Sequence, residues 1–408
     1  MSTELHIEHQ CPQCGAPAQL AEMDRLFACP FCRVRSYLLP ADVFRYVLPH
    51  RTRRDEQLIY IPYWRFKGTF CSCVAPKVDA SVVDATVRAV RHENFPDTLG
   101  LRPQAMGLRF ATPETCGRFI RPQITAAEAV AIFGREQGGL RLDPELHQEF
   151  LRESLSLIYH PYYIKGRLFD GVRDRAISPM MPPGFENSLP EWEPPQWDIR
   201  FVPVICPQCG WDLEGERDSL LLTCGNCGSA WEAHPGGFEG QETAYMPEEG
   251  TTAAYLPFWR IEADVEGIDL RTYADLAEVT NLPQLTQPGW EVQPFHFWVP
   301  GFRTHPEMFL NLARTLCLTQ PPHEPQEQAP SPASVWSTTV PLAEARRSLM
   351  VILSSLMREP ATLRVDVRNI HIAPRRSLLT YIPFQEKGTE LAHLGYRIAV
   401  RRNALVQP

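Results

Sequence analysis

Two sets of four cysteines constrain this chain more than any other feature of its sequence. The first set is Cys11-Pro-Gln-Cys14-Gly with Cys29-Pro-Phe-Cys32, and the second is Cys206-Pro-Gln-Cys209-Gly with Cys224-Gly-Asn-Cys227-Gly. In both sets, 14 residues separate the two Cys-x-x-Cys pairs. Each pair can direct two sulfurs at one ion, and four thiolates form the tetrahedral site of structural zinc. The sequence therefore predicts two zinc ribbons with one zinc ion each.

The composition favours metal over disulfides as the role of these cysteines. The N-terminal segment MSTELHIEHQ lacks the features of a signal peptide, and no apolar run approaches the length of a membrane span. We therefore expect a cytoplasmic protein, in which thiols stay reduced and twelve cysteines point to metal. Iron of the rubredoxin type is the main alternative, but rubredoxins have a much longer spacing between their two cysteine pairs.

The cysteine sets recur at an offset of 195 residues, and the match extends beyond them. The segment Tyr60-Ile-Pro-Tyr-Trp64-Arg65 recurs at the same offset as Tyr255-Leu-Pro-Phe-Trp259-Arg260. Weaker copies of this aromatic box begin at Tyr159 and Tyr381, and Pro113-Glu114 resembles Pro306-Glu307 at an offset of 193. A nearly constant offset that includes both cysteines and aromatic boxes indicates an internal duplication.

We predict an α+β protein of two tandem repeats, each a four-cysteine ribbon followed by a strand-rich domain with one or two packed helices. The expected units are a ribbon over 1–40, a domain over 41–181, a proline-rich linker over 182–200, a ribbon over 201–238 and a domain over 239–408. Within the last unit, the polar and proline-rich segment 319–334 is predicted to be a mobile insert.

The boxes are predicted to be strands. Alternation places Tyr60, Pro62 and Trp64 on one face and Arg65 on the other. Proline lacks the N–H that a ladder needs, so we expect each box at a sheet edge or at the start of its strand.

Four segments carry helix signals. Thr125 and Glu128 form a capping box before an apolar run. Asp143-Pro144 is typical of a helix start, and the apolar residues after it have helical spacing: Leu146, Phe150, Leu151 and Leu155. The segments 305–318 and 342–357 show similar spacing in the second half.

The ribbons resemble those at the N-terminus of general transcription factor B of archaea and eukaryotes, over about 30 residues in each half. The wider pattern of a CPxCG ribbon followed by a Tyr-x-Pro-aromatic-Trp strand resembles a group of bacterial zinc-ribbon proteins labelled helicase-like, for which no activity is established. The chain contains no Gly-x-x-x-x-Gly-Lys-[Ser/Thr] phosphate loop, so the helicase label does not carry over. The cyclin-like helices of the transcription factor are also absent from the sequence pattern. The resemblance implies the metal ligands and little more.

Outside the ribbons, few residues are candidates for chemistry. Cys71 and Cys73 lie two apart on a predicted strand, so they share a face and could bind metal or oxidise. His160 could act as a general base, but its counterparts in the other boxes are apolar, which indicates a packing position. Cys116 and Cys317 are expected to be buried thiols.

The aromatic boxes have two interpretations. Core packing in a repeated fold is the simpler one. In the other, the boxes form an exposed edge that accepts a strand from a partner, through Tyr60, Trp64, Arg65, Tyr255, Trp259 and Arg260.

Three functions are compatible with these features. The first is a non-catalytic zinc-stabilised scaffold or adaptor that binds protein partners in a cytosolic or membrane-associated complex. The second is nucleic-acid binding through Arg25, Arg33, Arg35 and the basic cluster 51–54, which the net charge of −8 disfavours. The third is a thiol redox or metal-handling role for Cys71 and Cys73.

Overall fold

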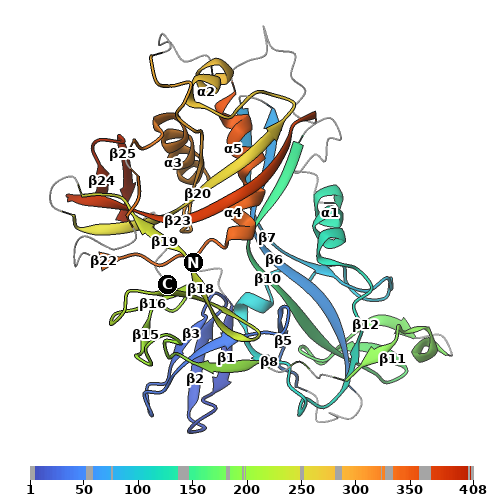
Figure 1. Cartoon of the computed structure of the whole chain (residues 1–408). Helices are drawn as coiled ribbons and strands as arrows, with labels where there is room; N and C mark the ends of the chain where they lie inside the picture. The colour runs from blue at the N-terminus through green and yellow to red at the C-terminus, as the bar shows by residue number, and fades with distance from the viewer. Residues whose placement is uncertain are drawn as a thin grey trace.

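The computed structural model describes residues 5–51, 58–74, 77–136, 147–180, 184–194, 197, 199–248, 252–280, 287–322, 324–326, 334–357, 369–402 and 405. These residues form a mixed, strand-rich fold in which two ribbons lie beside two sheets (Figure 1). Among the described helices, none is both long and apolar enough to cross a membrane.

Short strands build the two ribbons, which lie together at the lower left of Figure 1. The first ribbon contains β1 (His6–Gln10), β2 (Pro17–Ala21), β3 (Leu26–Ala28) and β4 (Arg35–Leu39). The second contains β14 (Arg200–Pro203), β15 (Leu213–Glu214), β16 (Leu221–Cys224), β17 (Ala230–His234) and β18 (Gly237–Gln241).

The first half forms a large sheet around two long strands. Its hydrogen-bonded order is β13 (Trp192–Glu193), β9 (Arg118–Ile120), β6 (Ile59–Val74), β10 (His147–Ile164), β5 (Phe44–Val47), β8 (Gly107–Phe110), β1 and β2. Beside this path, β7 (Lys77–Arg88) pairs with β6, and β11 (Arg167–Asp170) lies between β10 and β12 (Arg175–Met180). The helix α1 (Ala126–Glu136) packs on β6 and β7.

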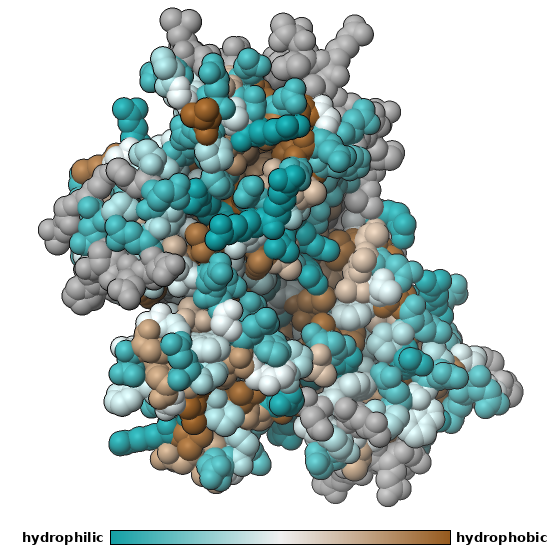
Figure 2. All heavy atoms as spheres, viewed as in Figure 1, coloured by the Kyte–Doolittle hydropathy of each residue, from teal (hydrophilic) through white to brown (hydrophobic). Residues whose placement is uncertain are grey.

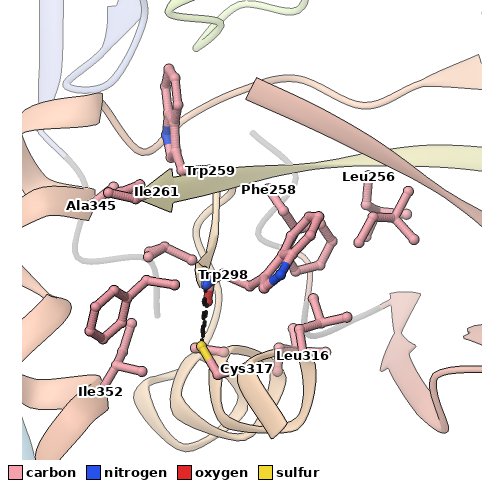
Figure 3. Close-up of a cluster of buried hydrophobic side chains, with 14 of the residues drawn as sticks. Leu256, Phe258, Trp259, Ile261, Trp298, Leu316, Cys317, Ala345 and Ile352 are labelled. Atoms are coloured by element: carbon pink, nitrogen blue, oxygen red, sulfur yellow. Dashed lines mark hydrogen bonds between the residues drawn. The ribbon is translucent and has the colours of Figure 1, made fainter. Parts of the chain in front are cut away.

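The second half has a smaller sheet covered by helices. Its order is β21 (Phe297–Pro300), β20 (Ala254–Glu266), β23 (His371–Lys387), β24 (Glu390–His393) and β25 (Ile398–Arg401), with β19 (Thr243–Tyr245) beside β23 and β22 (Ser334–Val335) beside β20. The helices are α2 (Tyr273–Thr280), α3 (Pro306–Thr319), α4 (Leu342–Arg347) and α5 (Leu349–Leu356). In Figure 3, Trp298 and Trp259 of the sheet lie among apolar side chains that include Leu316 of α3 and Ile352 of α5.

The four boxes pair with one another in the same register in both halves. On β6 and β10, Tyr60 lies opposite Pro161 and Pro62 opposite Tyr159. On β20 and β23, Tyr255 lies opposite Pro383 and Pro257 opposite Tyr381. The strand that follows each ribbon, β5 or β19, then runs parallel to the second box of its half. The two halves therefore build the centre of their sheets in the same way.

The prediction that the boxes lie at sheet edges is wrong, since β6 and β20 each have neighbours on both sides. On one side of β6, β9 ends its pairing opposite Tyr60 and β7 begins opposite Tyr63. Pro62 lies in the gap between these two neighbours, and there its carbonyl accepts the amide of Ala89 at 2.9 Å. Pro257 lies in the corresponding gap between β22 and β21. A missing N–H is tolerated at such a break as it is at an edge.

The helix predicted to begin at Asp143-Pro144 is also wrong. Residues 143–146 lie outside the described residues, and the segment that follows is the strand β10, which pairs with β6 along its whole length. A β-bulge between Arg152 and Ser154 shifts the alternation of side chains. This shift puts apolar residues on both sides of the bulge at helix-like spacing, which explains the error.

The other helix predictions are confirmed. The amide of Glu128 donates to Thr125 Oγ1 at 3.2 Å and the amide of Thr125 donates to Glu128 Oε2 at 2.8 Å, which is the expected capping box. The segment 305–318 forms α3, while 342–357 forms α4 and α5. The proposed match of Pro113-Glu114 with Pro306-Glu307 is wrong in structure, because Pro306 begins a helix and Pro113 lies in a turn. Of the predicted mobile insert 319–334, residues 323 and 327–333 lie outside the described residues.

Candidate metal centres

The four Cys-x-x-Cys turns, which we call knuckles, share one backbone conformation. In each, the amide of the residue after the second cysteine donates to the carbonyl of the first cysteine, at 2.8–2.9 Å. That residue has a positive φ in all four knuckles: 71° at Gly15, 61° at Arg33, 76° at Gly210 and 71° at Gly228. This conformation directs the two cysteine side chains of a knuckle toward one point.

The sulfur positions fit a metal ion in both ribbons. The Sγ atoms of Cys11 and Cys32, of Cys14 and Cys29, and of Cys206 and Cys227 lie 3.7 Å apart, and those of Cys209 and Cys224 lie 3.4 Å apart. All four sulfurs of each set lie within 4.8 Å of one another. Four sulfurs bound tetrahedrally at about 2.3 Å would be roughly 3.8 Å apart. Each set can therefore hold one metal ion, and four thiols are a donor set compatible with zinc.

Neighbouring groups favour the thiolate form that a metal needs. The backbone amide of Cys32 faces the thiol of Cys29 and lowers its pKa to about 6. In the second ribbon, the hydroxyl of Ser229 lies 2.9 Å from Cys227 Sγ and also accepts a hydrogen bond from the indole of Trp231 at 2.8 Å. Contacts of this kind orient ligands and tune a metal site from outside its coordination sphere.

Replacing Arg33 by glycine is expected to stabilise the first ribbon by about 1 kcal/mol, because Arg33 holds a left-handed conformation that glycine adopts without strain. The matched control is Gly228→Ala, which should destabilise by a similar amount since its added Cβ meets no atom within 4 Å and only the backbone is affected. Urea unfolding of both variants measures the two changes. Equal signs for the two substitutions would contradict this account of the knuckle.

The two ribbons pack against each other rather than standing apart. Strand β14 pairs antiparallel with β4 of the first ribbon. The amides of Arg25 and Leu26 donate to the carbonyl of Arg217, and Tyr37 Oη donates to the carbonyl of Ser219 at 3.1 Å. The shared core contains Leu26, Tyr37, Leu39, Val204, Cys206, Leu213, Leu222 and Cys224. Two metal ligands of the second ribbon thus belong to a core built from both ribbons.

A buried ion pair ties the first ribbon to the first-half sheet. Glu22 lies between β2 and β3 and accepts a hydrogen bond from Arg65 at 3.1 Å and another from Ser154 at 2.8 Å. Arg65 also pairs with Asp84 of β7 at 2.5 Å, and its side chain is only 1% exposed. The expectation that Arg65 steers an acidic partner from the surface is therefore wrong, because its charge is satisfied inside the molecule.

The second ribbon is tied to the second half in another way. The amide of Leu220 donates to the carbonyl of Thr338 at 2.9 Å, and the hydroxyls of Ser219 and Ser337 lie 2.9 Å apart. Asp218 pairs with Arg303, and both side chains are largely buried. Sequence analysis missed these contacts, and no motif in the chain marks them.

The aromatic boxes are core elements. Tyr60, Tyr255 and Trp259 are almost completely buried, so the interpretation of an exposed box edge is wrong for them. The indole of Trp64 donates to the carbonyl of Ile124 at 2.6 Å, and the indole of Trp259 donates to that of Val340 at 2.9 Å. Of the predicted partner-binding residues, Arg260 alone keeps a partly exposed charged group.

Cys71 and Cys73 share a face of β6, as predicted, but they are buried against Val351 of α5. Burial raises the pKa of Cys71 to about 12 and that of Cys73 to about 11, which suppresses the reactive thiolate. Cys317 is buried as expected and accepts a hydrogen bond from the amide of Trp298 at 3.2 Å (Figure 3). The prediction for Cys116 is wrong, since this thiol is exposed.

Iodoacetamide at pH 8 is expected to modify Cys116 at least about 100-fold faster than Cys71 or Cys73, because only the thiolate reacts and the two buried thiols stay protonated. Mass spectrometry of the labelled, folded protein gives the rates for all three residues. Rapid labelling of Cys71 or Cys73 would contradict their burial and restore the redox hypothesis.

His160 occupies a closed position between two polar neighbours. Its Nδ1 donates to the carbonyl of Pro161 at 3.1 Å, while Arg102 donates to its Nε2 at 3.2 Å and to Asp170 at 2.8 Å. Burial lowers the pKa of His160 to about 4, against the opposing effect of Asp170, and the side chain has no exposed surface. This environment supports the packing interpretation over the general-base one.

The basic residues proposed to contact nucleic acid are not gathered on one described surface feature. The guanidinium of Arg25 lies over the ring of Phe44 at 4.7 Å, Arg33 is exposed in its knuckle and Arg35 is half-buried. Arg51 is exposed, while the remaining residues of the cluster 51–54 lie outside the described residues.

Comparison with known proteins gives no match to this chain among family models, curated proteins or solved structures. The functional argument therefore depends on the chain's own residues.

Proposed function

We propose that this chain is a non-catalytic scaffold or adaptor, stapled by two zinc ions, that binds protein partners. The observation that carries the proposal is the joint core of the two ribbons, in which metal ligands, β14 and β4 hold the two halves together. A metal placed there stabilises the arrangement of two sheets, which is a structural role rather than a reactive one.

The proposal includes an internal duplication. Its support is the shared register of the boxes, the parallel strand after each ribbon, and the matching hydrogen bonds of Trp64 and Trp259. A duplicated, metal-stapled unit presents two related surfaces, and such surfaces can hold two partners or two sites of one partner.

The groups best suited to chemistry outside the ribbons support a structural role. Cys71, Cys73 and His160 all lie in the interior with pKa values moved away from reactive forms. Each contacts packing neighbours, and Cys71 and Cys73 lie where α5 of the second half covers β6 of the first.

The test is affinity purification of the tagged full chain from its native host, with chemical cross-linking and quantitative mass spectrometry. The expected result is a small set of proteins enriched and cross-linked at defined lysines. A variant with Cys11 and Cys206 both changed to serine is the control, and it should lose these partners together with its metal. Recovery of no stable protein partner would overturn the adaptor proposal.

A further inference from the structure

A large groove separates the second ribbon from the second-half sheet. It encloses about 1010 Å³, and Ser229 and Gln241 of the ribbon face Arg260 and Leu378 of the sheet across it. We call this space the ribbon groove. Figure 2 shows hydrophilic side chains gathered over the region of β20 and β23 in Figure 1.

Arg260 is the inner charged group of the ribbon groove. Its side chain is 16% exposed, and its Nε is buried without a hydrogen-bond partner among the described residues. One terminal nitrogen meets Glu324 at 3.3 Å, but that carboxylate is 85% exposed. A buried N–H of a charged group without an acceptor is costly, so Arg260 is poised to accept a further carboxylate.

The first half shows what an arginine at this position binds. Arg65 lies opposite Ser156 on the paired box strand, and Arg260 lies opposite Leu378, each next to the matching tryptophan of its box. Arg65 receives the carboxylate of Glu22 from the first ribbon. At the position of the second ribbon that is offset from Glu22 by 195 stands Arg217, which pairs with Asp24 of the first ribbon instead. In the second half, the ribbon groove occupies the place of this internal carboxylate.

The remaining charges of the groove favour one carboxylate over a polyanion. Arg376 and Glu242 form an exposed rim pair 3.9 Å apart, and Glu262 is also exposed. Burial, and secondarily Arg260, lowers the pKa of His296 to about 4, so this imidazole is neutral near pH 7. Three rim carboxylates, those of Glu242, Glu262 and Glu324, would repel a nucleic-acid backbone but leave the inner guanidinium open to a single acidic side chain.

A strand edge runs along the same groove. Among the described strands, β18 pairs only with β17, and its last residues Gly240 and Gln241 line the groove. An unpaired edge offers main-chain donors and acceptors to an added extended segment.

We propose that the ribbon groove binds an extended segment of a partner protein, with one Glu or Asp side chain of that segment paired to Arg260 and its backbone beside β18. This inference rests on the proposed adaptor function and names the chemistry of its partner. Glu324 then acts as a weak internal competitor for the same guanidinium.

The test measures binding of the full chain to two arrays of immobilised octapeptides with random neighbours, one with a central Glu and one with a central Gln. Wild type is expected to prefer the Glu array by about 10-fold or more, as a charge-assisted pair requires. Arg260→Gln should reduce this ratio to about one. Glu324→Gln should strengthen binding to the Glu array by roughly two- to five-fold, since it removes a competing exposed pair.

Controls separate this site from general effects. Arg376→Gln at the rim should change the ratio by less than about two-fold, and an unchanged thermal midpoint establishes that Arg260→Gln is folded. Equal Glu-to-Gln ratios for wild type and Arg260→Gln would overturn the proposal, as would glutarate that competes as well as free Glu peptide. Partners captured equally by both proteins would sink the groove site and leave the adaptor function standing; a preference that depends on Arg260 without captured partners would do the reverse.

Discussion

Removal of the metal from one ribbon is expected to unfold both ribbons together. Binding of structural zinc contributes on the order of 10 kcal/mol to the folding of small metal-dependent units, and a ribbon of this length has little core of its own. Cys206 and Cys224 share their core with Leu26 and Tyr37 of the first ribbon. Loss of the second site should therefore expose the hydrogen bonds from Arg25 and Leu26 to the carbonyl of Arg217.

Hydrogen exchange with mass spectrometry of Cys224→Ser measures this coupling. The amides of Arg25 and Leu26 should lose protection, although they lie in the ribbon whose four cysteines are intact. The matched variant Cys29→Ser should expose the second ribbon in return. Protection of each ribbon that is unchanged by mutation of the other would show that they are independent modules.

Replacing Arg65 by methionine is expected to cost about 3–5 kcal/mol at neutral pH, since it leaves the carboxylate of Glu22 buried without its cation. Glu22→Gln in the same chain should recover much of this loss. The matched control is Arg260→Met, which should cost less than about 1 kcal/mol because its ion pair is with an exposed carboxylate. Urea unfolding of the single and double variants measures the coupling between Arg65 and Glu22.

The cost of Arg65→Met should grow with pH. Burial raises the pKa of Glu22 in the folded protein, against the opposing effect of Arg65. A carboxyl whose folded pKa is raised contributes stability that is present below its unfolded pKa and lost as pH rises through the folded value. Without Arg65 the folded pKa rises further, so more stability is lost above it. A cost that is independent of pH, or unchanged by Glu22→Gln, would contradict the buried pair.

The sequence identified what repeats and what binds metal through spacing alone. The knuckles needed only the eight cysteines and their neighbouring glycines, and Arg33 shows that the backbone conformation persists where glycine is missing. The boxes were predicted as strands because they alternate, and alternation also placed Cys71 and Cys73 on one face.

The remaining features depend on contacts that no local pattern encodes. The bulge at Arg152 turned a strand into an apparent helix, and Pro62 is tolerated because two neighbouring strands stop on either side of it. Arg65 and Arg260 are identical in their boxes, yet one is buried by Glu22 and the other lines a groove. That difference arises from how each ribbon is oriented on its sheet.

Metal analysis with X-ray absorption on the purified full chain tests the central claim most directly. The account predicts two zinc ions per chain, each with four sulfur ligands at about 2.3 Å. Cys11→Ser and Cys206→Ser should each alter the sulfur count at one site. Iron in place of zinc, fewer than two bound ions, or a first shell containing nitrogen or oxygen in wild type would contradict it.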